Sequence, residues 1–369
     1  MSNFGCLSMK RPQCNYDISQ DVESSIRSSG INPESLRGKT VLITGGTGFF
    51  GVWMISALLS IKCSLGGDLR LILLSRSPEG FLHAHTDQHF ETLVEFVRGD
   101  VRDFRLDCAQ HVTHLVHMAT TNAEETFAGE DQLKKLEMLH EGTRNVLEQC
   151  GGSLESTLFT SSGVAYGVNR NALISESDHT APDTTDLGSA LGFGKLVAEY
   201  LIAYYAAKLG YSYSIARCFA FGGQYLPLDI HYAFGNFIRD ALDGKDIMIR
   251  GDGQDVRSYL YIGDATAWLL RLLAEPANQM YNVGSSQPIS IENLARKIAS
   301  QVKVPVNVTI QGRRSEVGNF RRSSYVPSTD KITKAYPGLA EWTPLEETIA
   351  KMLLVNPAHN SAGMTPVRH

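Results

Sequence analysis

The sequence predicts an α/β protein built on a doubly wound parallel sheet, with a smaller lobe toward the C-terminus. Three observations support this. Short apolar runs recur along the chain, helical or loop segments separate them, and a glycine-rich turn follows the first run. Because the runs are continuously apolar, they suit parallel strands buried on both faces of a sheet. With 369 residues, the chain is long enough for two domains or one large domain with a lobe.

Strands and helices are expected in alternation through the first two thirds of the chain. The first apolar run, KTVLIT, ends in glycines, and a segment of helical length without a breaker follows it. Such alternation gives a doubly wound sheet with right-handed crossovers. The expected strands are 39–44, 69–76, 93–101, 111–119, 156–163 and 211–219, and the expected helices are 52–61, 131–150 and 194–209.

The alternation of strands and helices ends at about residue 221. The sequence then favours helices over 235–243, 265–274 and 291–302, with a short strand pair around IMIRGDG and SYLYIG. At the other end, residues 1–36 are polar and weakly patterned. We therefore expect an N-terminal extension outside the fold, with one helix over about 18–29.

Composition excludes several classes of protein. Hydrophobic residues make up 43% of the chain and charged residues 20%, which excludes disordered, collagen-like and coiled-coil proteins. The net charge of −5 and the absence of a long basic run argue against a nucleic-acid partner. The six cysteines are scattered without a C-x-x-C pair, so a reducing compartment fits best.

Nothing in the sequence predicts a membrane association. The N-terminus lacks the apolar core of a secretory signal. The longest uncharged apolar stretch, 49–61, falls short of the ~18 residues that suggest a membrane span. We expect a cytoplasmic protein.

The turn after the first strand predicts a dinucleotide site. The segment GGTGFFG, from Gly45 through Gly48 to Gly51, lies between an expected strand and an expected helix. Glycines there let the backbone approach a pyrophosphate and let the helix pack closely. Phe49 and Phe50 open the helix, whose first amide groups would face the anion.

The second strand leaves the choice between NAD and NADP open. An acidic residue at its end would bind the ribose 2′-hydroxyl of NAD. Here the strand ends in Leu-Ser-Arg-Ser instead. Arg76 could meet the 2′-phosphate of NADP, or it could be a solvated loop arginine.

Six motifs in one order resemble a known family. They are TGGTGFFG, GDVRD, HMAT, TSSGVAYG, GDGQDVRSYLYIGDA and YNVG. Together, over about residues 37–349, they resemble the extended short-chain dehydrogenase/reductase family, the NAD-dependent epimerases and dehydratases of nucleotide sugars. The resemblance implies a Rossmann-type sheet that binds NAD or NADP and a C-terminal lobe that binds the sugar nucleotide.

The expected domains follow from this resemblance and from the element pattern. Residues 37–225 would form the NAD(P)-binding domain, to which sheet segments after 255 could return, and 226–350 would form the nucleotide-sugar lobe. Residues 1–36 would be the N-terminal extension and 351–369 a C-terminal tail.

The resemblance also implies roles for single residues. Asp100 and Val101 would flank the adenine, and Ala119 would lie near the nicotinamide half. Ser162 matches the serine that hydrogen-bonds the reacting sugar oxygen. Lys195 matches the lysine that binds the nicotinamide ribose and lowers the pKa of a catalytic tyrosine.

That tyrosine is missing. The position four residues before Lys195 holds Leu191, which has no proton to exchange. Losing a general acid/base typically costs about 10²- to 10⁴-fold in rate. Three explanations stay open: an engineered replacement, a natural variant whose proton shuttle is Ser162, Tyr166, Lys195 or a water, and a cofactor-binding protein that no longer catalyses.

Further departures narrow the reaction. The family's dehydratases and decarboxylases carry an acid two residues before the tyrosine of TSSGVAYG, where this chain has Val164. Loss of water or CO₂ is therefore disfavoured, and epimerisation or simple oxidation and reduction remain. Two asparagines usual in relatives are Ala220 and Glu141 here.

The substrate diphosphate calls for cationic partners. Arg257 matches the arginine that contacts it in relatives, and a guanidinium binds phosphate bidentately. Alternatively, Arg257 could form an ordinary ion pair with Asp252 or Asp255. Asn236 matches a position near the nucleotide. The arginine cluster at 313–322 offers one more candidate, Arg314.

Two histidine groups invite a metal hypothesis. They are His83, His85 and His89, and His111, His114 and His117. Neither has a carboxylate or thiolate partner at ligand spacing, so we expect no metal site.

The sequence thus favours an NAD(P)-dependent epimerase or oxidoreductase of a nucleoside diphosphate sugar that works through a transient keto intermediate, as in polysaccharide or glycoconjugate synthesis. The alternative is a non-catalytic NAD(P)-binding sensor or interaction protein of the same fold. Relatives dimerise through two long helices, so we expect a homodimer through 131–150 and 194–209.

Overall fold

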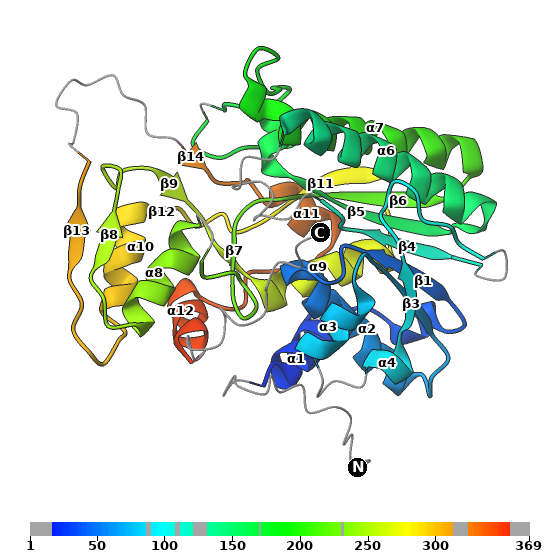
Figure 1. Cartoon of the computed structure of the whole chain (residues 1–369), viewed down its shortest axis with the longest axis horizontal. Coiled ribbons are helices and arrows are strands. Elements are labelled where there is room, and N and C mark those ends of the chain that lie inside the picture. The colour runs from blue at the N-terminus through cyan, green and yellow to red at the C-terminus, as the bar shows by residue number, and fades with distance from the viewer. Residues whose placement is uncertain are drawn as a thin grey trace.

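The computed structural model describes residues 17–85, 90–107, 111–120, 131–169, 171–229, 232–312 and 324–354. Its centre is a seven-stranded parallel sheet with helices on both faces, and a smaller lobe lies at one end (Figure 1). The predicted α/β class is confirmed. The strands are β1 (Thr40–Thr44), β2 (Arg70–Ser75), β3 (Glu95–Arg98), β4 (His114–His117), β5 (Ser156–Ser162), β6 (Ser212–Cys218) and β11 (Gln279–Val283).

The strand order places a switch point between β1 and β4. Across the sheet the order is β11-β6-β5-β4-β1-β2-β3, so the chain runs outward from β1 to β3 and then returns to the other side of β1. Thr44 at the end of β1 pairs with His117 at the end of β4. Ligands of open α/β sheets bind outside the carboxyl ends of the strands at such a point.

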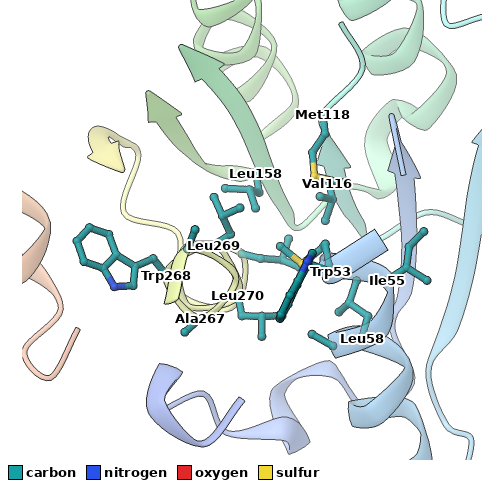
Figure 2. Close-up of a cluster of buried hydrophobic side chains, with 14 of the residues drawn as sticks. Trp53, Ile55, Leu58, Val116, Met118, Leu158, Ala267, Trp268, Leu269 and Leu270 are labelled. Atoms are coloured by element: carbon teal, nitrogen blue, oxygen red, sulfur yellow. The ribbon is translucent and has the colours of Figure 1, made fainter. Parts of the chain in front are cut away.

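Helices cover both faces of the sheet. On one face lie α6 (Gln132–Cys150) and α7 (Ala190–Leu209), which pack along each other (Figure 1). On the other lie α2 (Phe49–Ser64) and α9 (Ile262–Ala274). Figure 2 shows Trp53 of α2 within the buried apolar cluster between α2, α9 and the sheet. Two short helices, α3 (Pro78–Ala84) and α4 (Phe90–Leu93), precede β3.

The N-terminal segment is part of the fold, contrary to our expectation for its described portion. The predicted helix exists as α1 (Ser19–Ser29), and it packs against α2 and α9. Ile18 and Val22 are about 1% exposed in the main core. The Ser25 hydroxyl also donates to the Gly263 carbonyl at 2.7 Å. The segment is polar overall, but one face of its helix is apolar. One apolar face is enough for a surface helix to pack on a core.

The C-terminal lobe has its own core. Its helices are α8 (Ala233–Leu242), α10 (Ile291–Ala299) and α12 (Leu345–Leu353), which share an apolar cluster. The boundary expected at residue 350 falls inside α12, where Met352 is buried. The predicted domain division let the chain return to the main sheet after residue 255. It does so with the strand β11, and the helices α9 and α11 (Asp330–Ala335) pack against strands of that sheet.

The lobe strands pair differently from the prediction. The two segments expected to pair form β8 (Ile247–Ile249) and β10 (Leu260–Tyr261), and they lie in separate sheets. β8 pairs with β13 (Val308–Ile310), while β10 pairs with β7 (Phe221–Gly222). The strand that separates β8 and β10 in the sequence is β9 (Val256–Arg257). It is the central strand of a third small sheet, with β12 (Ile289–Ser290) on one side and β14 (Ser324–Tyr325) on the other. Short strands carry too little pattern to specify a partner.

No helix in the described part of the chain is long and apolar enough to cross a membrane.

Candidate active site

The glycine turn is shaped by contacts that exclude side chains. Gly45 adopts a left-handed φ of 69°, and a Cβ there would lie 2.6 Å from the Met118 carbonyl carbon. A Cβ on Gly51 would lie 2.3 Å from the Gly46 backbone, so α2 packs directly against the turn. Gly48 differs, because the nearest atom to its Cβ would be 3.5 Å away, an ordinary contact.

This difference fits a bound dinucleotide. Packing within the protein does not demand a glycine at position 48, whereas the close approach of a pyrophosphate does. Gly48 is the N-cap of α2, and no side chain caps the helix there. The 16-residue helix that begins at Phe49 therefore presents its N-terminal end at the switch point, where amide groups and the helix dipole favour an anion. Phe50 packs on Phe221 with ring centres 4.8 Å apart.

His117 ties this turn to the opposite face of the sheet. Its Nδ1 lies 2.6 Å from Thr44 Oγ1, and its Nε2 lies 2.9 Å from Thr143 Oγ1 on α6. Burial, and secondarily the charge of Lys195, lower the pKa of His117 to about 3, so the ring is neutral. The Thr44 hydroxyl also accepts from the Ala119 amide at 3.3 Å. Sequence reasoning weighed His117 only as a metal ligand and missed this structural role.

The predicted adenosine residues lie together at the ends of β2 and β3. Arg76 is exposed directly after β2, and its charge acts on Asp100. Burial opposes the ionised form of Asp100, but hydrogen bonds from Arg102 and the charges of Arg102 and Arg76 lower its pKa overall. Val101 turns its side chain toward α6, where a Cβ on Gly142 would lie 2.6 Å from it. The contacts of Arg76 leave the choice between NAD and NADP open.

Lys195 lies at the carboxyl end of β5, which also carries Ser162. The helix starts at Ala190, four residues earlier than predicted, so Lys195 stands in its second turn. The side chain is only 4% exposed, and its Nζ donates to the Thr160 carbonyl at 2.8 Å. Burial lowers the pKa of Lys195 to about 8. Lys195 is therefore not a surface lysine, and buried groups with a shifted pKa are often found at functional sites.

A buried network fixes Lys195 and Ser162 relative to each other. Glu199, one helical turn after Lys195, forms an ion pair with Arg217 of β6 at 2.7 Å. Glu199 also accepts from the hydroxyl of Ser161, the neighbour of Ser162. Because both ions are about nine-tenths buried and each has its partner, α7 is held firmly on β5.

Tyr166 belongs to this network and not to the reacting centre. It is completely buried, and its hydroxyl donates to Asn282 Oδ1 on β11 at 2.8 Å. Burial is the main cause that raises its pKa to about 12, and the Arg217 guanidinium lies 4.3 Å from its ring centre. A fully enclosed phenol of high pKa whose hydroxyl already bonds Asn282 does not suit a proton shuttle to a substrate, which argues against Tyr166 as a catalytic group.

Leu191 occupies the place of the missing tyrosine. It is half-buried in the first turn of α7, and the four-residue spacing puts it on the same face as Lys195. The backbone there is close to the 3₁₀ turn Gly163–Tyr166, since a Cβ on Gly192 would lie 2.9 Å from the Val164 carbonyl oxygen. The position therefore lies close to the turn that follows Ser162, but the leucine side chain has no proton to exchange.

Tyr325 of β14 places a phenol beside the turn that follows Ser162. A Cβ on Gly163 would lie 2.6 Å from that hydroxyl oxygen, so only a glycine leaves room for it. Phe219 supports the ring at a centre-to-centre distance of 4.7 Å. Sequence reasoning missed this residue, because it follows an arginine-rich loop and belongs to no recognised motif.

The structure describes two of the three predicted substrate-binding residues of the lobe, Arg257 and Asn236. Arg257 in β9 is half-buried beside Tyr325, and its Asp255 partner is 3.8 Å away, beyond hydrogen-bond distance. Its Nη1 donates to the Val256 carbonyl at 2.9 Å. Asn236 of α8 accepts from Arg239 at 3.2 Å. Arg314 lies outside the described residues.

The histidine groups form no metal centre in the part of the chain that is described, where no cluster of three His, Cys, Asp or Glu side chains occurs. His85 bonds the Phe81 carbonyl at 2.9 Å, and His114 bonds Thr113 at 3.0 Å. His83 and His111 are exposed, and His89 lies outside the described residues.

The turn, the switch point and the strand-end lysine define a dinucleotide-binding α/β protein. The sequence profile of the NAD dependent epimerase/dehydratase family matches residues 41–284, about two thirds of the chain. The protein belongs to this family, and the predicted resemblance is confirmed.

Individual relatives are similar over most of their length. UDP-N-acetyl-alpha-D-glucosaminuronate decarboxylase of Bacillus cytotoxicus is 24% identical over 84% of this chain and 97% of its own. UDP-glucuronate 4-epimerase 4 of Arabidopsis thaliana is 26% identical over 84% of this chain and 77% of its own.

A solved structure is similar in fold. UDP-glucuronic acid 4-epimerase from Bacillus cereus, in complex with UDP-glucuronic acid and NAD, aligns with a TM-score of 0.68 and 20% identity. The alignment covers 85% of this chain and 98% of that one.

Proposed function

We propose that this chain is an NAD-dependent enzyme that epimerises or oxidises and reduces a nucleoside diphosphate sugar at a carbon bearing a hydroxyl group. The observation that carries the proposal is Lys195, buried at the carboxyl end of β5 beside Ser162 and fixed there by the Glu199–Arg217 pair. A sensor that only binds a cofactor has no need to hold a serine and a desolvated lysine in this register.

The residues present fit the cofactor and divide its binding between them. The turn at Gly45, Gly48 and Gly51, with the amides of Phe49 and Phe50, would hold the pyrophosphate. Asp100, Val101 and Arg76 would border the adenosine, while Ala119 and Lys195 would lie by the nicotinamide ribose. When bound, the cofactor would supply hydride transfer to and from the sugar carbon, the chemistry that a transient keto intermediate needs.

The protein's own groups handle the oxygen and the diphosphate. Ser162 would hydrogen-bond the reacting sugar oxygen. Arg257 would bind the diphosphate, with Asn236 and Arg314 near the nucleotide. Val164, in place of an acidic residue, supports epimerisation or redox chemistry over loss of water or CO₂, although relatives include decarboxylases. The name of a relative therefore does not fix the reaction of this chain.

The exposed face of the two long helices supports a homodimer. Tyr200 and Tyr204 of α7 are 68% and 49% exposed, and their rings stack at 6.2 Å. Leu133 of α6 is 58% exposed. Large apolar side chains exposed on the outer helices of a fold are typical of a self-associating surface.

A second function, a non-catalytic NAD-binding sensor, is favoured by one observation, the leucine at position 191. Product analysis separates the two. The protein is incubated with NAD and UDP-glucose, UDP-glucuronic acid or UDP-N-acetylglucosamine, and the sugars are analysed by NMR. We expect an epimer or oxidised sugar from at least one of them and none from a Lys195→Met control that still folds. Saturable binding of these sugars without conversion of any would establish the sensor.

A further inference from the structure

A second lysine is buried beside the candidate active site. Lys135 of α6 is 3% exposed and belongs to the buried stripe of that helix, together with Leu139 and Thr143. Thr143 bonds the buried ring of His117, so this stripe faces the sheet. The neighbouring Lys134 is exposed. Lys135 is therefore internal, which is rare for a lysine without a paired charge.

Two contacts fix the register of α6 against α7. The helices precede the neighbouring parallel strands β5 and β6, so both run antiparallel to the sheet and begin at its carboxyl edge. A Cβ on Gly194 would lie 2.4 Å from the Leu139 side chain, and further along the Tyr205 hydroxyl donates to Glu148 at 2.7 Å. One turn before Leu139, the same register brings Lys135 to the level of the first turn of α7.

This level is that of the missing tyrosine. Leu191 lies in the first turn of α7, close to the turn that follows Ser162. The Lys135 Nζ donates to the side-chain oxygen of Gln132, three residues earlier, so the ammonium leans toward the start of α6 and the carboxyl edge of the sheet. Lys195 brings another buried ammonium to this edge. Two cations thus lie near the place that a sugar ring would take beside Leu191.

In the part of the chain that the structure describes, Lys135 has no carboxylate partner. Its hydrogen bond with Gln132 is long, at 3.4 Å, and the acceptor is a neutral amide. Asp131, the N-cap of α6, accepts from the Leu133 amide instead, and the ion pair of this helix lies toward its other end. Neither α6 nor α7 has an acid in its first turn, and helix N-termini disfavour a cation. A buried charge in such a place calls for an anionic partner.

We propose that Lys135 is a specificity residue that binds a carboxylate on the sugar, so that the preferred substrate is a nucleoside diphosphate uronic acid. This inference rests on the proposed function. There, Arg257 in the lobe binds the substrate diphosphate and the glycine turn binds the cofactor pyrophosphate, so neither anion reaches the start of α6. A carboxylate on the sugar ring does, because the ring would lie between Ser162 and Leu191.

Two ligands that differ in this group test the inference. UDP-glucuronic acid has a carboxylate where UDP-glucose has a hydroxymethyl group. With the NAD-loaded wild-type protein, we expect calorimetry to show about 10- to 100-fold tighter binding of UDP-glucuronic acid, the effect of one charge-assisted hydrogen bond. The measurement needs no turnover, and steady-state kinetics with the same two sugars should show the same preference in KM.

The matched variants are Lys135→Met, Lys135→Arg and Lys134→Met. Lys135→Met removes the charge and keeps a long side chain, so we expect the preference for UDP-glucuronic acid to disappear, while the affinities for UDP-glucose and NAD change little. Lys135→Arg keeps a cation and should retain most of the preference. Lys134→Met removes the exposed neighbouring charge and should retain all of it, which separates a contact from general attraction.

A folding defect is checked by thermal unfolding. We expect Lys135→Met to unfold at the wild-type temperature or above it, because an apolar side chain replaces a buried cation that lacks a carboxylate partner.

Each result bears on one proposal. Equal wild-type affinity for the two sugars, or an equal loss of both affinities in Lys135→Met, overturns this inference and leaves the proposed function intact. A loss of NAD affinity in Lys135→Met, with the sugar preference retained, also overturns it and assigns the ammonium to the cofactor. A preference for UDP-glucuronic acid that depends on Lys135, without conversion of any sugar, supports the carboxylate contact and overturns the proposed function.

Discussion

The two ends of the candidate site differ in how closely they keep to the family pattern. At the cofactor end, tight contacts leave no room for a side chain at Gly45, and the Thr44 hydroxyl bonds both His117 and Ala119. At the chemical end, Lys195 is buried against the strand that carries Ser162, but Leu191 stands where the family pattern has a tyrosine. The difference teaches that the tight contacts of a glycine turn can be kept while a side chain at the chemical end departs from the family pattern.

The largest expected effect comes from Lys195→Met, because Lys195 would lie where the cofactor end meets the chemical end. We expect kcat to fall by at least about 10²-fold, because a positioned proton-relay group of this kind contributes that much. The unfolding free energy at pH 7 should rise by about 1 to 3 kcal/mol, since burial lowers the lysine pKa to about 8 and the ammonium is disfavoured in the fold.

The pH dependence of the unfolding free energy provides a control for this prediction. Between about pH 8 and pH 10.5 the unfolded chain binds more protons at Lys195 than the folded one, so wild-type stability gains from this residue as pH rises. Chemical denaturation across this window measures it. An identical pH slope in Lys195→Met would contradict the buried-charge interpretation.

Gly45→Ala tests the cofactor end alone. The left-handed φ and the clash with Met118 should lower the unfolding free energy by about 2 to 5 kcal/mol. We expect NAD affinity to fall as well, measured by calorimetry below the unfolding temperature. Gly66→Ala is the control, because its φ is also positive but nothing lies within 4 Å of its Cβ. Equal NAD binding by both variants would show that the turn does not shape the site.

Arg257→Met tests the substrate side of the chemical end. Loss of a charge-assisted contact with the diphosphate should raise the KM for a UDP-sugar by about 10- to 100-fold. NAD affinity should stay unchanged. Steady-state kinetics and calorimetry distinguish these effects, and a drop in kcat with constant KM would assign Arg257 to another step.

His117 gives a stability prediction that is confined to the cofactor end. Its folded pKa of about 3 lies below the ordinary value of 6.5, so its contribution is complete above about pH 6.5 and is lost as pH falls toward 3. Between pH 7 and pH 5 the loss should be about 2 kcal/mol. Denaturant unfolding of wild type and His117→Asn compares the slopes, and a steeper acid slope in the variant would refute this account.

The smallest effect on chemistry is expected at the exposed face of α7. Tyr200→Lys with Tyr204→Lys should weaken self-association by about 2 kcal/mol, with turnover per chain nearly unchanged. Light scattering over a concentration series measures this. A wild-type chain that is monomeric throughout would remove the dimer proposal.

The sequence predicted the regular parts well for a physical reason. Continuous apolar strands and the glycine turn depend on local pattern, so the parallel sheet, the long helices and the dinucleotide turn could be read directly. The N-terminal helix was placed correctly, but its packing was missed, because a stripe as narrow as Ile18 and Val22 has little weight in a polar segment.

The chemical end was less predictable. Ser162 and Lys195 follow from motif spacing, but the enclosure of Tyr166 depends on Asn282, more than a hundred residues away. The place of Tyr325 beside Gly163 depends on how β14 pairs with β9, and two-residue strands do not specify their partner in sequence.

The most direct test of the central claim, that the chemical end is altered but competent, is rapid mixing of the NAD-loaded wild-type protein with each UDP-sugar. Absorbance of the reduced nicotinamide is followed through a single turnover. The account predicts a transient rise with at least one sugar, which decays as product forms. Saturable sugar binding by calorimetry with no absorbance change for any sugar would contradict it and identify a chain that binds but does not catalyse.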